Sequence, residues 1–163
     1  MATSEDARRF LRSYRRATVK YESLNEEFER YHTRLYSKPL VANYSGVGGG
    51  GAASDTMGAN VAEFVDYKEG IKNDLKAYAA IKADIWGVLN QVSETNERWG
   101  LSLHYRYIDG LNPTEAAYEM NYADPSSERR DHARALEYVA SKWPNTIRRD
   151  LALLDAMCKR EEK

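Results

Sequence analysis

The sequence predicts an all-α fold in which a long helical hairpin with a heptad pattern, residues 1–93, precedes a helix-turn-helix domain, residues 94–163. Two observations carry this prediction. Apolar residues recur at alternating steps of four and three in two long segments. After residue 93 the heptads give way to shorter helical segments that are separated by Gly, Asn, Asp and Pro turn signals.

The composition fits helices in an extended arrangement. Of the 163 residues, 42% are hydrophobic and 30% are charged, which is too apolar for a disordered chain and too charged for a large spherical core. The net charge of −1 does not by itself indicate a nucleic-acid or membrane partner. Cys158 is the single cysteine of the sequence, which excludes a disulfide framework and a thiolate zinc site.

The first long helix is expected over residues 4–37. Ser4 can serve as its N-cap, and Glu5 and Asp6 place carboxylates in the first turn, where the helix dipole favours them. The helix should end at Lys38 and Pro39, because the residue before a proline avoids the helical region. Its apolar seam consists of Phe10, Tyr14, Ala17, Tyr21, Leu24, Phe28, Tyr31 and Leu35.

A Gly-rich linker is expected at residues 39–56. The glycines of residues 46–51 have no side chains to pack, and the segment is therefore flexible. No apolar strand precedes this run and no Lys-Ser or Lys-Thr follows it, which argues against a phosphate-binding loop.

The second heptad helix is expected over residues 57–93. Lys68 and Lys82 interrupt its apolar seam, and polar seam positions often set the register or the choice of partner. Two heptad helices joined by a linker predict an antiparallel hairpin within one chain, or pairing of each helix with a second chain. Because an isolated two-helix hairpin buries little surface, we expect it to dock against the rest of the chain or to form a homodimer. The seam consists of Met57, Val61, Phe64, Lys68, Ile71, Leu75, Tyr78, Lys82, Ile85, Leu89 and Val92.

Turn signals divide residues 94–163 into four helices. The first, capped by Ser93 or Thr95, is expected to run through Ile108. The other boundaries are marked by residues that suit helix ends: Gly110 as a C-cap, Asn112 with Pro113 as the start of a short helix to Met120, Asn121 as a left-handed stop, Asp124 with Pro125 as the start of a helix to about Trp143, and Pro144 as the start of the last helix.

The short helix, the turn and the helix that begins at Pro125 have the pattern of a helix-turn-helix. Ala116 and Ala117 are small enough for the second helix to cross closely. The first turns of a recognition helix reach the edges of the bases. Arginine there can donate two hydrogen bonds to guanine, and serine hydroxyls and backbone amides at a helix start can hold phosphates.

The segment Leu103–Leu136, LHYRYIDGLNPTEAAYEMNYADPSSERRDHARAL, resembles region 4 of bacterial sigma factors. With the heptad segment upstream, the chain resembles the ArpU/RinA-type phage late-gene transcriptional regulators. The resemblance implies a sequence-specific DNA-binding regulator of phage or prophage genes that activates late genes, with double-stranded DNA and RNA polymerase as partners. The DNA-binding residues that it implies are Thr114, Ser126, Ser127, Arg129, Arg130 and Arg134.

A basic stretch lies at the other end of the sequence. From Ala7 to Tyr21 it contains six cationic residues and no acidic one. These cations could contact phosphates or an acidic partner surface, or they could form the solvated side of a heptad helix. The arginines in question are Arg8, Arg9, Arg12, Arg15 and Arg16.

The sequence gives little support to catalysis. His32, His104 and His132 are far apart and lack metal-ligand spacing, and Cys158 lies on the apolar face of the last helix, where packing explains it. We therefore expect a protein that is not an enzyme, with no catalytic residues, no cofactor and no metal. Two alternatives to the regulator are a small-terminase-like DNA packaging subunit, which would form a ring, and a protein-binding helical adaptor.

The sequence also bears on location. Its start, residues 1–6, is polar and acidic, so we expect no signal peptide. No apolar run approaches the roughly 20 residues that span a bilayer, so we expect no membrane partner. The expected location is the cytoplasm of the bacterial host cell.

Overall fold

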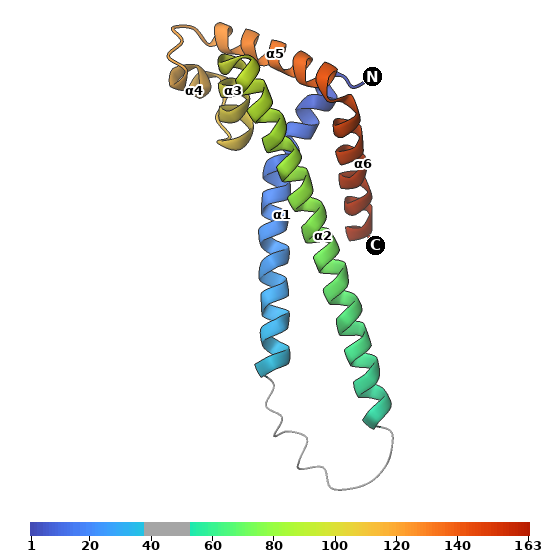
Figure 1. The fold of residues 1–163 in the computed structure, drawn as a ribbon. Helices are drawn as coiled ribbons and strands as arrows, with labels where there is room; N and C mark the ends of the chain where they lie inside the picture. The colour runs from blue at the N-terminus through green and yellow to red at the C-terminus, as the bar shows by residue number, and fades with distance from the viewer. Residues whose placement is uncertain (38–52) are drawn as a thin grey trace. The chain divides into compact units, whose positions relative to one another are not determined.

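The computed structural model describes the backbone of residues 1–37 and 53–163, and the side chains of residues 1–34 and 62–163 (Figure 1). Over these residues the fold is all-α, as the sequence predicts, with no β-strand. The elements are α1 Ser4–Ser37, α2 Ala53–Thr95, α3 Glu97–Leu103, the π-helical turn η2 His104–Ile108, α4 Pro113–Glu119, α5 Pro125–Lys142 and α6 Pro144–Glu161.

Contacts divide the chain into two compact units. The first unit comprises Met1–Val19 and Ala77–Lys163, and the second comprises Lys20–Lys76. The first turns of α1 and the last turns of α2 are therefore grouped with residues 94–163, whereas the sequence suggested a boundary at residue 93. The physical reason is that the apolar side chains of these turns are buried in the first unit, as Phe10, Leu11, Ile81, Ile85 and Val92 are.

In the second unit, α1 and α2 pair antiparallel. The ring of Tyr31 stacks on that of Phe64 with centroids 5.0 Å apart, and the Lys68 ammonium lies 5.9 Å from the Phe28 ring. Residue numbers rise along α1 as they fall along α2, as the matched seams predict. Lys68 is thus a seam residue whose cation contacts an aromatic face.

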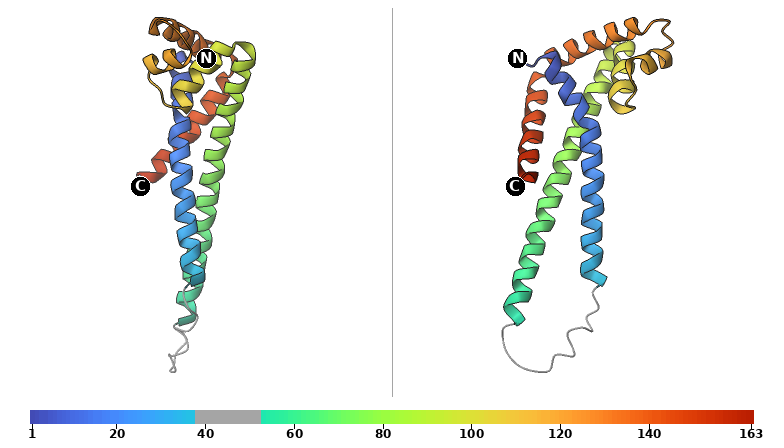
Figure 2. Two further views of the ribbon diagram at one scale, coloured as in Figure 1. Left: turned by 90° about the vertical axis from the view of Figure 1, so that its left-hand side faces the viewer. Right: turned by 180° about the vertical axis from the view of Figure 1, so that it is seen from behind.

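In the first unit, α6 packs beside α1 and α2 (Figure 2). Arg149 of α6 forms an ion pair with Asp84 of α2, and Asp155 of α6 lies 3.7 Å from Arg9 of α1. The second polar seam residue, Lys82, lies 5.5 Å from the Tyr14 ring of α1. The core consists of apolar side chains from α1, α2, α5 and α6 together with Leu103 of α3, Tyr107 of η2, and Ala116 and Ala117 of α4.

Most helix ends lie where the sequence places them. Asn112 and Glu115 form a reciprocal capping box at the start of α4, and the Asp124 side chain caps α5. Gly110, with φ of 72°, and Asn121, with φ of 57°, adopt the left-handed conformation. This conformation is accessible to glycine and tolerated by asparagine, and it ends or redirects the chain at both points.

Four details differ from the sequence-based expectation. Thr3 rather than Ser4 caps α1, because its hydroxyl accepts from the Asp6 amide while the Asp6 carboxylate accepts from the Thr3 amide. Asn96, not Ser93 or Thr95, caps α3, because its side chain accepts from two backbone amides. The helix expected through Ile108 changes to π-helical hydrogen bonding at His104.

The fourth difference concerns the linker. Its last residues, 53–56, belong to α2 rather than to the expected Gly-rich break. The end of the first helix at Lys38 and Pro39 and the glycine run at residues 46–51 lie outside the described residues. Among the helices that are described, none combines the length and the apolar character needed to cross a bilayer.

Candidate functional site

The site begins with the packing of two short helices on α5. Helices α3 and α4 both contact α5, and a turn at residues 120–124 joins α4 to α5 (Figure 1). Ala116 and Ala117 are buried in this packing, and small side chains there permit the close crossing that the sequence predicts. The Tyr122 hydroxyl donates a hydrogen bond to the Asp131 carboxylate, which ties the turn to α5.

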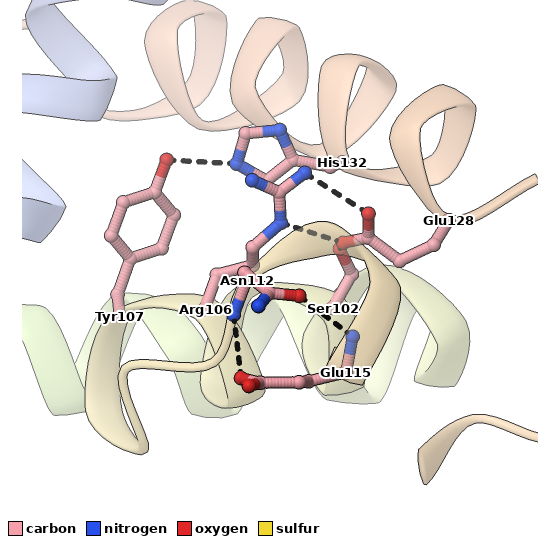
Figure 3. A network of polar contacts seen from close by, with 7 residues as sticks. All are labelled: Ser102, Arg106, Tyr107, Asn112, Glu115, Glu128 and His132. Atoms are coloured by element: carbon pink, nitrogen blue, oxygen red, sulfur yellow. Dashed lines mark hydrogen bonds and ion pairs between the residues drawn. The ribbon is translucent and has the colours of Figure 1, made fainter. Parts of the chain in front are cut away.

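A buried carboxylate fixes α5 against η2 and α3 (Figure 3). Glu128 has no exposed surface. Its carboxylate accepts hydrogen bonds from Arg106 Nε at 2.9 Å, from Arg106 Nη2 at 3.0 Å and from the Ser102 hydroxyl at 2.8 Å. A bidentate guanidinium–carboxylate pair specifies both distance and orientation. It therefore sets the rotation of α5 about its own axis.

One turn later, a second buried contact repeats this constraint. His132 Nε2 and the Tyr107 hydroxyl lie 2.8 Å apart, and the two rings stack. Burial, together with the positive charge of the neighbouring Arg106, lowers the pKa of His132 from 6.5 to about 4. The imidazole is therefore neutral at pH 7. The Tyr107 phenol has a raised pKa, chiefly because of its burial.

These contacts turn the other face of α5 to solvent. Glu128 and His132 point inward, while Ser126, Arg129 and Arg130 are exposed. Four of the six residues implied by the resemblance are thus exposed on α5, namely Ser126, Arg129, Arg130 and Arg134. Thr114 is exposed at the start of α4, and Ser127 is partly buried.

The start of α5 offers side chains rather than free amides. The Asp124 carboxylate accepts from the Ser126 amide at 3.0 Å, and the Asp124 carbonyl accepts from the Ser127 amide at 3.2 Å. The bond from the Ser126 amide holds the pKa of Asp124 below its usual value, so this carboxylate remains ionised at pH 7. The two amides expected to hold phosphates are therefore already occupied.

The N-terminal basic stretch divides into two faces. Arg9 approaches Asp155, and Arg16 Nη2 donates to Cys158 Sγ at 2.9 Å, so both contact α6. Arg8, Arg12 and Arg15 occupy another side of α1, at the spacing of one helix face. There they line a cavity of about 510 Å³, which we call the arginine pocket.

The arginine pocket gathers side chains from three parts of the first unit. Arg106 of η2 and Arg129 of α5 join the three arginines of α1 in its wall. Its complete lining is Arg8, Arg12, Arg15, Arg106, Tyr107, Gly110, Leu111, Arg129, His132 and Ala133. Gly110 lies so close to Arg15 that a Cβ atom added there would stand 2.2 Å from Arg15 Nη1.

Only part of the pocket's charge is balanced. Arg106 is paired with Glu128, and Arg8 Nη1 lies 2.9 Å from Glu5. Within the described part of the chain, no carboxylate lies within 4.0 Å of the guanidinium groups of Arg12, Arg15 and Arg129. The pocket therefore holds three arginines that form no ion pair among the described residues, and of these Arg129 also interacts electrostatically with the Asp124 carboxylate.

The sequence does not mark Arg106 or Tyr107 as site residues, and it was not used to predict the inward positions of Glu128 and His132. A signal for the last two was present. Glu128 and His132 continue at helical spacing into the buried residues Ala135 and Val139, so they belong to the inward stripe of α5. No comparable signal indicated that Arg106 would meet the arginines of α1.

Comparison with protein-family models, with curated proteins and with solved structures finds no match for this chain. Among the described side chains, no three His, Cys, Asp or Glu residues gather closely enough to hold a metal ion. The geometry of α5 and of the arginine pocket is thus the basis on which a function is proposed.

Proposed function

We propose that this chain binds double-stranded DNA sequence-specifically and regulates the transcription of phage or prophage genes. The observation that carries the proposal is the orientation of α5. Its buried residues Glu128 and His132 leave Arg129, Arg130 and Arg134 exposed to solvent. Arginines at the start of such a helix are suited to donate bidentate hydrogen bonds to guanine in the major groove.

The distribution of charge supports the same proposal. Residues 95–150 contain eight Lys and Arg but nine Asp and Glu, so this segment lacks the positive charge typical of DNA-binding domains. The first turns of α1 bring Arg8, Arg12 and Arg15 next to Arg129. They add positive charge beside the start of α5, where contacts to the DNA backbone would orient the protein.

Late-gene activation, contact with RNA polymerase and homodimerisation are finer parts of this proposal, and they rest on the resemblance to the ArpU/RinA-type regulators and on the heptad seams.

Mass measurement in solution separates the proposal from its closest alternative. A monomer or dimer is expected for the regulator, whereas a closed ring would favour a DNA packaging subunit.

The direct test requires a duplex selected from a randomised pool with the full-length chain. Arg130→Ala should weaken binding to the selected duplex by ~1–3 kcal/mol, the range for one good base contact, and weaken binding to a scrambled duplex much less. Arg148→Ala, which removes an exposed arginine of α6, serves as the matched control and should change neither.

Two results would contradict the proposal. If Arg129→Ala and Arg130→Ala both leave the ratio of selected to scrambled affinity unchanged, this face of α5 does not read bases. If the chain binds no duplex at any salt concentration, the three-helix arrangement of α3, α4 and α5 is better explained as a protein-docking surface of an adaptor.

A further inference from the structure

We propose that the arginine pocket is a binding site for ligands with two or more phosphate groups, supplied by a free phosphorylated molecule or by the backbone of bound DNA. For the DNA source, the inference rests on the proposed function. For the free ligand it does not. The two sources share one chemistry, which is that of closely spaced phosphate oxygens.

The first argument is the unbalanced charge of the pocket. Arg12, Arg15 and Arg129 line one cavity and form no ion pair among the described residues. Like charges that share a cavity repel one another, and the repulsion is relieved when an anion enters. Arg8 and Arg12 also contribute to lowering the pKa of buried His132. The positive potential therefore extends into the wall of the pocket.

The second argument is the kind of cation. Guanidinium groups present planar pairs of N–H donors that match the oxygens of a phosphate, and arginine is preferred where phosphates are bound bidentately. A pocket that balanced its own charge would instead contain carboxylates. The two carboxylates that form ion pairs with arginines of the lining, Glu128 and Glu5, are already bound by Arg106 and Arg8.

The third argument is size. Arg8, Arg12 and Arg15 follow one another along one side of α1, and seven residues of helix span roughly 10 Å. A row of this length exceeds one phosphate group and suits two or three in succession. The cavity of about 510 Å³ lies within the range of small-molecule sites, and Arg129 faces the row from α5.

The fourth argument concerns the position of Arg15. Gly110 allows the Arg15 guanidinium to lie against the backbone of the turn after η2, and a side chain at position 110 would displace it. Gly110 also has a φ of 72°. Asparagine adopts this conformation more readily than most residues with a side chain, so Gly110→Asn moves Arg15 at less backbone strain than other substitutions and provides a second way to perturb the pocket.

The test uses the full-length chain and two double variants of equal charge. The pocket variant is Arg12→Gln with Arg15→Gln. The control variant is Arg9→Gln with Arg16→Gln, which removes two arginines of the same helix that contact α6 instead. Circular dichroism is used to check that both double variants and Gly110→Asn fold. Pyrophosphate and tripolyphosphate are titrated calorimetrically at constant ionic strength.

In the free-ligand arm, both polyphosphates should bind the native chain, and the pocket variant and Gly110→Asn should each bind at least tenfold more weakly. The control variant should stay within twofold of the native chain. In the DNA arm, the slope of log affinity against log salt should become shallower by about two in the pocket variant relative to the control, because each lost phosphate contact changes it by about 0.9.

The polyphosphate titration and the DNA salt series together distinguish the two sources of the phosphate. Loss in the calorimetric arm identifies a free ligand, and loss of salt dependence identifies the DNA backbone. Pocket and control variants that behave alike in both arms would overturn the inference. The two proposals fail separately: polyphosphate binding without DNA binding contradicts only the proposed function, and DNA binding unaffected by the pocket variant, without polyphosphate binding, contradicts only this inference.

Discussion

Substitution of Glu128 by Gln should destabilise the first unit far more than its similar shape suggests. The native carboxylate is fully buried and accepts three hydrogen bonds, two of them from Arg106. A glutamine amide has one accepting oxygen and one donating nitrogen, so its NH2 group would face an N–H donor of Arg106 or the Ser102 hydroxyl. Arg106 would also lose the charge that balances it beside the other arginines of the pocket.

The size of the effect follows from these contacts. Removing one partner of a buried ion pair costs about 3–5 kcal/mol. The side chain of Arg106 is 18% exposed and keeps some access to water. We therefore expect a loss near the lower limit, about 3 kcal/mol in the free energy of unfolding. Ser102→Ala removes only the hydroxyl bond and should cost about 1 kcal/mol.

Urea unfolding followed by tryptophan fluorescence measures this effect. The three tryptophans, Trp86, Trp99 and Trp143, all belong to the first unit, so the signal reports on that unit. Glu119→Gln, at an exposed position of α4, is the matched control and should change stability by less than about 0.5 kcal/mol.

A double substitution, Arg106→Met with Glu128→Met, completes the test. Removing both charges should cost less than Glu128→Gln alone, because no unpaired charge remains. The reasoning would be refuted if Glu128→Gln lost no more stability than Ser102→Ala, or if the double variant were the less stable of the two.

Three further predictions concern pH and the long helices. The pKa of His132 is about 4 in the folded state and 6.5 in the unfolded state, so the free energy of unfolding should fall as pH drops from 6.5 toward 4, by at most about 3 kcal/mol. In a pH series of urea unfolding, His132→Gln should abolish this decrease. Burial and the adjacent Asp84 raise the pKa of Asp150 from 3.8 to about 6, so ionisation of this carboxyl lowers the free energy of unfolding as pH rises from 3.8 to 6. Asp150→Asn should remove this decrease from the pH series of urea unfolding. An unchanged pH profile would contradict the prediction. Leu24 and Leu75 both lie in the second unit. The double substitution Leu24→Asp with Leu75→Asp should reduce the helicity measured by circular dichroism, while the first unit still shows an unfolding transition in tryptophan fluorescence. Unchanged helicity and thermal stability would show that these positions do not stabilise the hairpin.

Local chemistry explains why much of the fold could be predicted from the sequence. Asn112, Asp124 and Gly110 act on backbone groups within a few residues, so their preference for helix ends does not depend on distant packing. Heptad spacing acts over a whole helix and likewise indicated the antiparallel pairing seen in the second unit. The wrong predictions concern neighbouring residues whose side chains suit an N-cap equally well, as those of Thr3 and Ser4 do.

At the corner between α2 and α3, tertiary packing determines which residue caps α3. Gly100 approaches Ser93 so closely that an added Cβ atom would stand 2.0 Å from the Ser93 hydroxyl. This close return of the chain holds Asn96 in an extended conformation, φ of −151° and ψ of 108°, which is the geometry of an N-cap. Ser93 and Thr95 have suitable side chains, but the chain does not leave the helix at either residue.

The sequence by itself determined that the protein is helical, where most of its helices begin and end, and that six cations lie together near the N-terminus. It could not assign those cations to partners, because Arg9 and Arg12 look alike in an unbroken basic run. Tertiary packing decided that Arg9 and Arg16 contact α6, whereas Arg12 and Arg15 meet Arg129 in one pocket. Such groups are more than 100 positions apart along the chain. The electrostatic interaction between them depends on distance in space, and only the packing of α1 beside η2 and α5 sets that distance.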